Sequence, residues 1–324
     1  MTWRDNTTRF LIFLVIILIV VICYGIIPIT GGFFNRFKWN RFRNRFNFLR
    51  LKSLLDYRQY RQLGNENNLR IINSTSDIYR FTGNIESITD GNTLWVRGDD
   101  LTIPVSLEKT KCFLLPMHEG EEESEGEAPQ QIRWNRVSTL SEGTKVFIGG
   151  QIRTEDNRLS FISSKEQPLM IIFYSCPDDE LTGRIIRSAR TRNEYWNSIT
   201  PASLVIGALA LISIAASFLG RPAFRLTVIT SFVAVFIPIL PVLPPGFLLT
   251  VLYRRLTWNA RRLRVDWDLL HFDLLPDVPK SLEKKYAIRA YSLEALAWMI
   301  MLLGAAVNVV FIFLILFVFN IISF

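Results

Sequence analysis

Blocks of hydrophobic residues alternate with polar segments along the chain. The first block, Phe10–Thr30, contains no charged residue and at 1.5 Å per residue crosses roughly 30 Å of hydrocarbon. Two more, Pro201–Leu219 and Leu296–Phe324, are long enough to do the same. No cleavage-like small-residue site separates the first block from the basic residues after it, which predicts an uncleaved anchor.

A further block, Leu226–Tyr253, is hydrophobic but broken. Its first half has an ordinary helical composition, and its second half contains Pro238, Pro241, Pro244 and Pro245. Each interior proline removes a backbone hydrogen bond and crowds the preceding turn. The pattern therefore predicts four membrane spans, of which the third is kinked or non-helical.

Between Ile78 and Tyr174 the hydrophobic period changes to two, which is typical of half-buried strands. Asp90-Gly91 between two alternating segments predicts a hairpin, and Gly149-Gly150 inside a strand predicts a bulge or a barrel corner. Six or seven short strands indicate a small antiparallel barrel or sandwich, for which an OB-like barrel is one candidate. An acidic insert at 118–130 predicts a loop.

The sequence thus predicts an α+β membrane protein with about four transmembrane helices and a small antiparallel β domain. The expected divisions are a first anchor (1–30), a basic amphipathic linker (31–70), a β-rich domain (71–177) with its acidic loop (118–130), a connecting helix (178–200), and three membrane segments (201–324) with a basic loop (254–291).

The linker after the first anchor has a pattern of its own. Trp39, Phe42, Phe46 and Leu49 recur at helical spacing, with arginines over most of the remaining surface. This pattern predicts a helix in the membrane interface. The residues expected to bind the membrane surface are Arg36, Lys38, Trp39, Arg41, Phe42, Arg43, Arg45 and Phe46. The alternatives are a helix docked on the β domain and, least favoured beside a membrane span, a nucleic-acid-binding helix.

Charge indicates the partner and the orientation. The net charge is +8, and the basic residues cluster beside hydrophobic blocks, so anionic lipid headgroups rather than nucleic acid are the expected partner. With four spans, every basic cluster lies on one side, which the positive-inside rule makes cytoplasmic. We therefore expect an integral protein of a bacterial inner or plasma membrane, with its β domain in the cytoplasm and a membrane-protein partner or second copy in the bilayer.

Few residues indicate catalysis. The chain has no P-loop, nucleophile-elbow, H-E-x-x-H or C-x-x-C motif, and no cofactor is expected. Asp266, Asp268 and His271 have a spacing that favours a divalent metal, whereas an amphipathic loop with solvated carboxylates explains the same pattern. The preferred function is a non-enzymatic membrane protein whose β domain is an interaction or assembly module. The alternatives are a metal-dependent hydrolase or transferase using Asp266–Asp277, and a small transporter using the broken third span.

The segment Gly143–Trp196 contains GTKVFIGGQIRTEDNRLSFIS, an apolar strand and a charged helix, and it precedes a span. It resembles the beside-a-membrane (GIDE-type) domain of mitochondrial RING ubiquitin ligases and their prokaryotic relatives. Three cysteines do not supply the eight ligands of a RING, so the resemblance implies no ligase activity. In the mitochondrial family the β domain faces away from the cytosol, opposite to the prediction from charge.

Overall fold

The computed structural model describes most of the chain, and it divides into two compact units. The residues described are 3–64, 78–89, 92–108, 110–115, 129–155, 158–164, 166–191, 197–272, 274, 279 and 281–318. One unit, called here the helical unit, consists of Met1–Lys38 and Asn193–Phe324. The other, the barrel unit, is Trp39–Arg192. The acidic insert predicted at 118–130 lies almost wholly outside the described residues, as does the Asp90-Gly91 turn.

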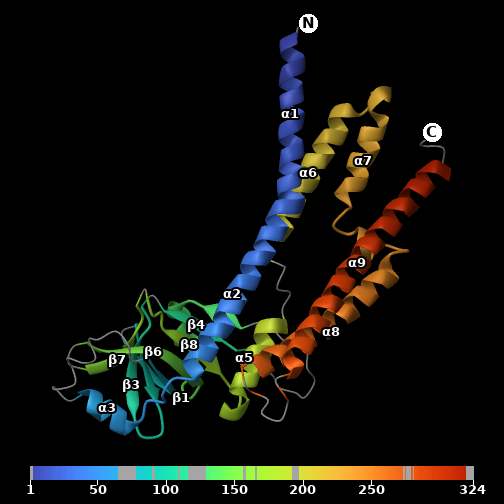
Figure 1. The fold of residues 1–324 in the computed structure, drawn as a ribbon. Coiled ribbons are helices and arrows are strands. Elements are labelled where there is room, and N and C mark those ends of the chain that lie inside the picture. Colours follow the sequence, from blue (N-terminus) through green and yellow to red (C-terminus); the bar gives the residue numbers. More distant parts are fainter. Residues whose placement is uncertain are drawn as a thin grey trace. The chain divides into compact units, whose positions relative to one another are not determined.

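The helical unit is built from long helices (Figure 1). Its elements are α1 (Trp3–Val21), the π-helical turn η1 (Ile22–Ile26), the first part of α2 (Ile27–Arg50), α6 (Thr200–Phe218), the short turn η3 (Pro222–Phe224), α7 (Arg225–Val235), the 3-10 turn η4 (Leu240–Val242), α8 (Phe247–His271) and α9 (Ser281–Val318). Helices α8 and α9 form an antiparallel hairpin, and α6 packs beside α1 and α7.

Among the described residues, three helices are long and apolar enough to cross a membrane: Leu11–Arg50, Thr200–Phe218 and Ser281–Ile315. They match three of the four predicted spans. The remaining block contains only the shorter apolar helix Pro222–Val235 before the chain breaks at the prolines, so its predicted non-helical half is confirmed. The segment 254–291, expected as a basic connection between the third and last spans, is mostly helical, because α8 and α9 fill most of it.

The barrel unit contains eight strands within its described residues. They are β1 (Ile78–Thr89), β2 (Thr93–Arg97), β3 (Thr102–Ser106), β4 (Lys111–Leu114), β5 (Gln130–Ile132), β6 (Lys145–Glu155), β7 (Arg158–Ile162) and β8 (Met170–Tyr174). Helix α3 (Tyr57–Gly64) precedes them, the 3-10 turn η2 (Trp134–Thr139) precedes β6, and α5 (Asp178–Thr191) follows β8. The hairpin predicted around residues 90 and 91 is confirmed by the antiparallel pairing of β1 with β2.

Five of the strands close a barrel in the order β1-β2-β3-β7-β6, with β6 returning to β1. Strands β8, β4 and β5 extend the sheet from β6. The pairings β3–β7 and β4–β8 are parallel, so the predicted all-antiparallel sheet is wrong. Parallel partners need a long crossover, and the segments between these strands supply it.

Two hydrophobic layers stabilise the barrel unit. One fills the barrel with β-strand residues and includes Leu55, and the other packs α2 and α5 against β4, β6 and β8. Strand β6 changes partner from β8 to β7 at Gly149 and Gly150, which confirms the predicted corner. A Cβ on Gly149 would lie 2.8 Å from the Leu49 side chain, so glycine is what lets α2 approach this strand.

Candidate functional site

The aromatic face of α2 is buried inside the barrel unit. Trp39, Phe42 and Phe46 are each less than 8% exposed. The Phe42 ring lies 4.6 Å from that of Phe113, and the Phe46 ring lies 5.2 Å from that of Phe147. The predicted membrane-surface role of these three aromatic residues is therefore wrong, and the docked-helix alternative explains their spacing.

The basic residues of the same helix have separate roles. Arg43 is only 2% exposed, and Arg45 donates to Gln167 Oε1 at 3.1 Å and to the Pro168 carbonyl at 3.0 Å. Burial, with a smaller effect of the nearby Arg41 charge, lowers the pKa of Arg45. Arg45 thus fastens α2 to the loop before β8. Of the predicted membrane-surface residues, Lys38 and Arg41 are exposed and Arg36 is half-buried, so membrane binding by these three stays a prediction.

An exposed apolar patch follows the docked part of α2. Its members, Phe48, Leu51, Leu54 and Tyr57, are between 40% and 71% exposed and recur every third residue. The Lys52 ammonium lies 4.4 Å from the centre of the Phe48 ring. We call these four side chains the barrel patch. The spacing of the buried residues Trp39, Phe42, Phe46 and Leu49 does not predict this patch, because its members are out of step with that series and three of them follow the end of α2 at Arg50.

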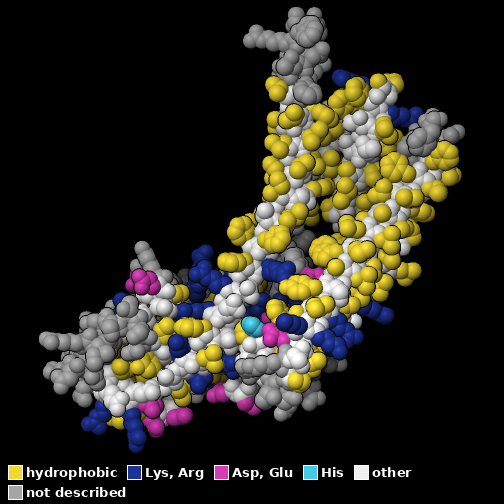
Figure 2. Space-filling model, viewed as in Figure 1, with side chains coloured by type: hydrophobic (Ala, Val, Ile, Leu, Met, Phe, Trp, Pro, Cys, Tyr) yellow, Lys and Arg dark blue, Asp and Glu magenta, His cyan; other side chains and the backbone are white. Residues whose placement is uncertain are grey.

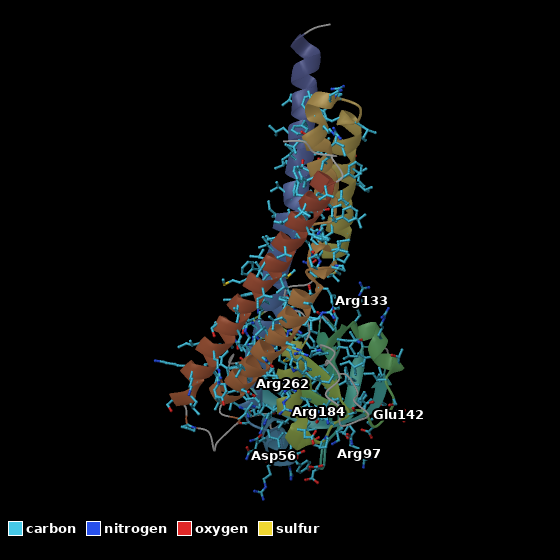
Figure 3. All side chains as sticks on the ribbon, turned by 90° about the vertical axis from the view of Figure 1, so that its right-hand side faces the viewer. Asp56, Arg97, Arg133, Glu142, Arg184 and Arg262 are labelled. Carbon is cyan, nitrogen blue, oxygen red and sulfur yellow. The ribbon has the colours of Figure 1, made fainter. Side chains whose placement is uncertain are left out.

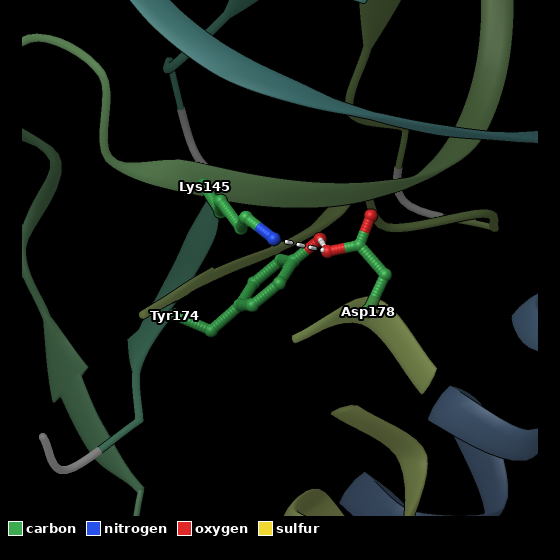
Figure 4. Close-up of polar contacts among 3 residues, drawn as sticks. All are labelled: Lys145, Tyr174 and Asp178. Atoms are coloured by element: carbon green, nitrogen blue, oxygen red, sulfur yellow. Dashed lines mark hydrogen bonds and ion pairs between the residues drawn. The ribbon is translucent and has the colours of Figure 1, made fainter. Parts of the chain in front are cut away.

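A polar cluster fixes the start of α5 against the barrel. The Lys145 ammonium lies 2.9 Å from Asp178 Oδ1, and the Tyr174 hydroxyl donates to the same oxygen at 3.2 Å (Figure 4). Burial, assisted by the Asp178 charge, raises the pKa of Tyr174 well above its ordinary value. Because Asp178 is also a favourable N-terminal charge for the helix dipole, this cluster positions α5 rather than forming a reaction centre.

The candidate metal ligands do not come together as a metal site. His271 Nδ1 lies 2.8 Å from Glu283 Oε1, and Asp268 is 5% exposed. Over the described residues, no group of three or more His, Cys, Asp or Glu side chains has the geometry of a metal site. Asp266 and Asp268 are two residues apart on α8, so they project from different sides of the helix. Asp273 and Asp277 lie outside the described residues.

The proline-broken segment is held by a buried amide. The side chain of Asn308 on α9 is 1% exposed, and its Oδ1 accepts from the Gly246 N–H at 3.1 Å. Its Nδ2 donates to the Leu243 carbonyl at 2.9 Å and to the Leu240 carbonyl. Backbone groups freed by a helix break need such partners in a bilayer. Three of the four hydrogen bonds available to the amide are used, so the arrangement is structural.

A second polar side chain supports the same break. The Tyr24 hydroxyl, on the π-helical turn η1, donates to the Val235 carbonyl at the end of α7 at 3.3 Å. Gly207 on α6 lies under the same ring, where an added Cβ would be 2.5 Å from Tyr24 Cδ1. The predicted transporter use of Pro238 is not tested by these contacts.

Comparison with family models, with curated proteins and with solved structures gives no match to this chain. The GIDE-type resemblance therefore remains a prediction.

Proposed function

We propose that this chain is a four-crossing membrane protein that holds an OB-like barrel on the cytoplasmic side as a non-enzymatic docking module for a protein partner. The long apolar helices support the membrane part of the proposal. The ring β1-β2-β3-β7-β6, closed through one parallel pair, supports the OB-like assignment, since OB folds are five-stranded Greek-key barrels.

The third crossing in this proposal is composite. It consists of α7, the turn η4 and the first turns of α8, and its broken middle is satisfied by Asn308 and Tyr24. Irregular backbone is tolerated at membrane depth where protein covers it, and these hydrogen bonds supply that cover.

Exposed charge supports the proposed side of the membrane. Arg254 and Arg255 are exposed in the first half of α8, and Arg289 is exposed near the start of α9, so all three lie between the apolar parts of the two helices and the turn that joins them. The α6–α7 connection, at the opposite end of the unit in Figure 1, has Arg221 and Arg225 alone. The larger cluster favours the cytoplasm.

The barrel patch is the observation that carries the docking function. Four exposed apolar side chains within ten consecutive residues of a water-facing unit favour an interaction site. Cationic groups border this patch, because the Arg45 guanidinium and the Lys52 ammonium both lie over the Phe48 ring, at 5.6 and 4.4 Å. The complementary partner is a protein segment with apolar anchors beside carboxylates.

Photo-crosslinking from the patch tests this function. A photoreactive phenylalanine analogue at Leu51 in the full-length chain should crosslink one discrete protein in membranes, whereas the same probe at the exposed residue Glu142 should not. Leu51→Asp combined with a probe at Leu54 should reduce the crosslink. Equal crosslinking from Leu51 and Glu142, or crosslinking to lipid alone, would contradict the proposal.

A further inference from the structure

The chain between α2 and α3 adds one short strand to the barrel. The Arg80 N–H donates to the Ser53 carbonyl at 3.0 Å, and the Leu55 N–H donates to the Arg80 carbonyl at 2.9 Å. These two bonds pair Leu54 in parallel with Arg80 of β1. On its other side Arg80 pairs with β6, so residues 53–55 form an outer edge of the sheet at this point. We call residues 53–55 the edge strand.

The unpaired side of the edge strand is at Leu54. In a parallel pair with these two bonds, the N–H and carbonyl of the middle residue point away from the neighbouring strand. Among the residues that the structure describes, none donates to or accepts from the Leu54 backbone. Leu54 is 48% exposed, so a partner can reach this edge. Unpaired backbone groups on an edge strand are a template for a further strand.

Exposed apolar side chains flank this backbone edge. Leu51 and Tyr57 of the barrel patch are 71% and 51% exposed, and they lie three residues before and after Leu54. Figure 2 shows hydrophobic side chains next to Lys and Arg side chains on the surface of the barrel unit. When a strand is added to a sheet edge, main-chain hydrogen bonds give affinity and contacts of alternate side chains give specificity. The barrel patch and the Leu54 backbone together provide both parts of such a site.

The residues around the edge strand carry an excess of positive charge. Four basic residues and one acidic residue occur from the last residue of α2 to the end of α3: Arg50, Lys52, Arg58, Arg61 and Asp56. The Asp56 carboxylate accepts from the Gln59 N–H at 2.7 Å, so it caps α3. The remaining positive charge favours an acidic segment as the added strand.

We propose that the edge strand receives an extended, acidic segment of the partner protein as an added strand. The Leu54 N–H donates to a carbonyl of that segment, and the Leu54 carbonyl accepts from one of its N–H groups. Alternate apolar side chains of the segment contact the barrel patch, and the carboxylates between them face the basic residues. This mode of binding rests on the docking function proposed above and specifies the class of partner, an extended segment in which apolar and acidic residues alternate.

Removing the Leu54 N–H tests strand addition. Leu54→Pro lacks this donor, and Leu54→Val is its control, because valine is also shorter than leucine and keeps the N–H. The readout is the crosslink formed in membranes by a photoreactive phenylalanine analogue at Leu51 of the full-length chain. The proline variant should crosslink roughly fivefold less than the valine variant, which corresponds to one hydrogen bond. The same probe at Glu142 is the control for location, and Figure 3 shows Glu142 apart from Asp56, the residue after the edge strand.

The urea midpoint of the barrel unit shows whether the proline variant is folded. Proline removes no internal hydrogen bond at this position, so both variants should unfold at similar urea concentrations. If the proline variant unfolds earlier, a peptide competition decides instead. The crosslinked segment is identified by mass spectrometry and added as a synthetic peptide. N-methylation of one alternate set of its residues should weaken competition roughly fivefold, and methylation of the other set should not, because only alternate residues of an added strand face the edge.

The outcomes separate strand addition from docking in general. A discrete crosslink that the proline and valine variants form equally, or that both N-methylated peptides inhibit equally, would overturn strand addition and leave the docking function standing. A crosslinked segment that is helical, that lacks acidic residues or that belongs to a second copy of this chain would also overturn it. If the Leu51 probe forms no discrete crosslink in the otherwise unchanged chain, the docking function itself is contradicted.

Discussion

Replacing Asn308 by leucine tests whether a buried amide holds the broken membrane segment together. Leucine has the same branched shape but is larger, and it removes three hydrogen bonds. The Leu240 carbonyl keeps a second donor, the Leu243 N–H at 3.2 Å. The Gly246 N–H and the Leu243 carbonyl lose the partners that Asn308 provides.

Two unpartnered buried groups set the size of the effect. A buried donor or acceptor left unsatisfied costs roughly 1–3 kcal/mol, while side-chain hydrogen bonds measured within membranes average about 0.6 kcal/mol. Leucine is also the better helix former, by about 0.5 kcal/mol. We expect Asn308→Leu to lower the free energy of unfolding by about 2 kcal/mol, between these limits.

Unfolding of the full-length protein in mixed micelles with increasing dodecyl sulfate, followed by helical circular dichroism, measures the change. Val310→Ala is the matched control, since Val310 is two residues away on α9 and 64% exposed. An Asn308→Leu protein as stable as the Val310→Ala protein would show that the broken backbone has other partners and that Asn308 does not hold it.

Three more predictions follow from packing and burial. Gly207→Ala places a methyl group 2.5 Å from the Tyr24 ring and should cost about 1–3 kcal/mol in the same dodecyl sulfate titration; an unchanged midpoint contradicts the close approach of α6 and η1. Phe46→Ala removes a side chain that is 1% exposed and should destabilise the barrel unit by about 3–5 kcal/mol in urea, while Phe48→Ala, at a position 40% exposed, should cost less than about 1 kcal/mol. Similar values for the two variants would contradict the docked orientation of α2. Burial raises the pKa of the Cys112 thiol from 9.0 to about 12. Its contribution to stability is therefore fully present below pH 9 and is lost as the pH rises towards 12, by about 1.4 kcal/mol per pH unit. Cys112→Val should show a shallower pH dependence of urea unfolding over this range, and an unchanged slope contradicts the burial.

Hydrophobic length and period predicted the membrane helices and the β region, because each is a local property of the chain. The break after Val235 was predictable for the same reason, since each proline acts on its own turn. The parallel pairing of β3 with β7 was not, because it joins strands separated by more than fifty residues, and no local property of the chain specifies such a pairing.

For helix α2, the sequence pattern predicted a buried face but not the surface that buries it. The spacing of Trp39, Phe42 and Phe46 correctly indicated that one face of the helix is buried, but amphipathicity does not identify the surface that covers it. The buried Arg43 was equally unexpected, because sequence alone gives a charged residue an exposed position by default. The contacts of Asn308 could not be predicted from the sequence either, because Gly246 lies 62 residues away along the chain.

We infer that the membrane separates the barrel unit from the α6–α7 connection, and the accessibility of introduced cysteines tests this topology. The three native cysteines are buried, so Glu142→Cys on the barrel or Ala223→Cys on the connection supplies the exposed thiol in each variant. We expect a membrane-impermeant maleimide to label Ala223→Cys in intact cells and Glu142→Cys only after permeabilisation. Labelling of both positions in intact cells would contradict it.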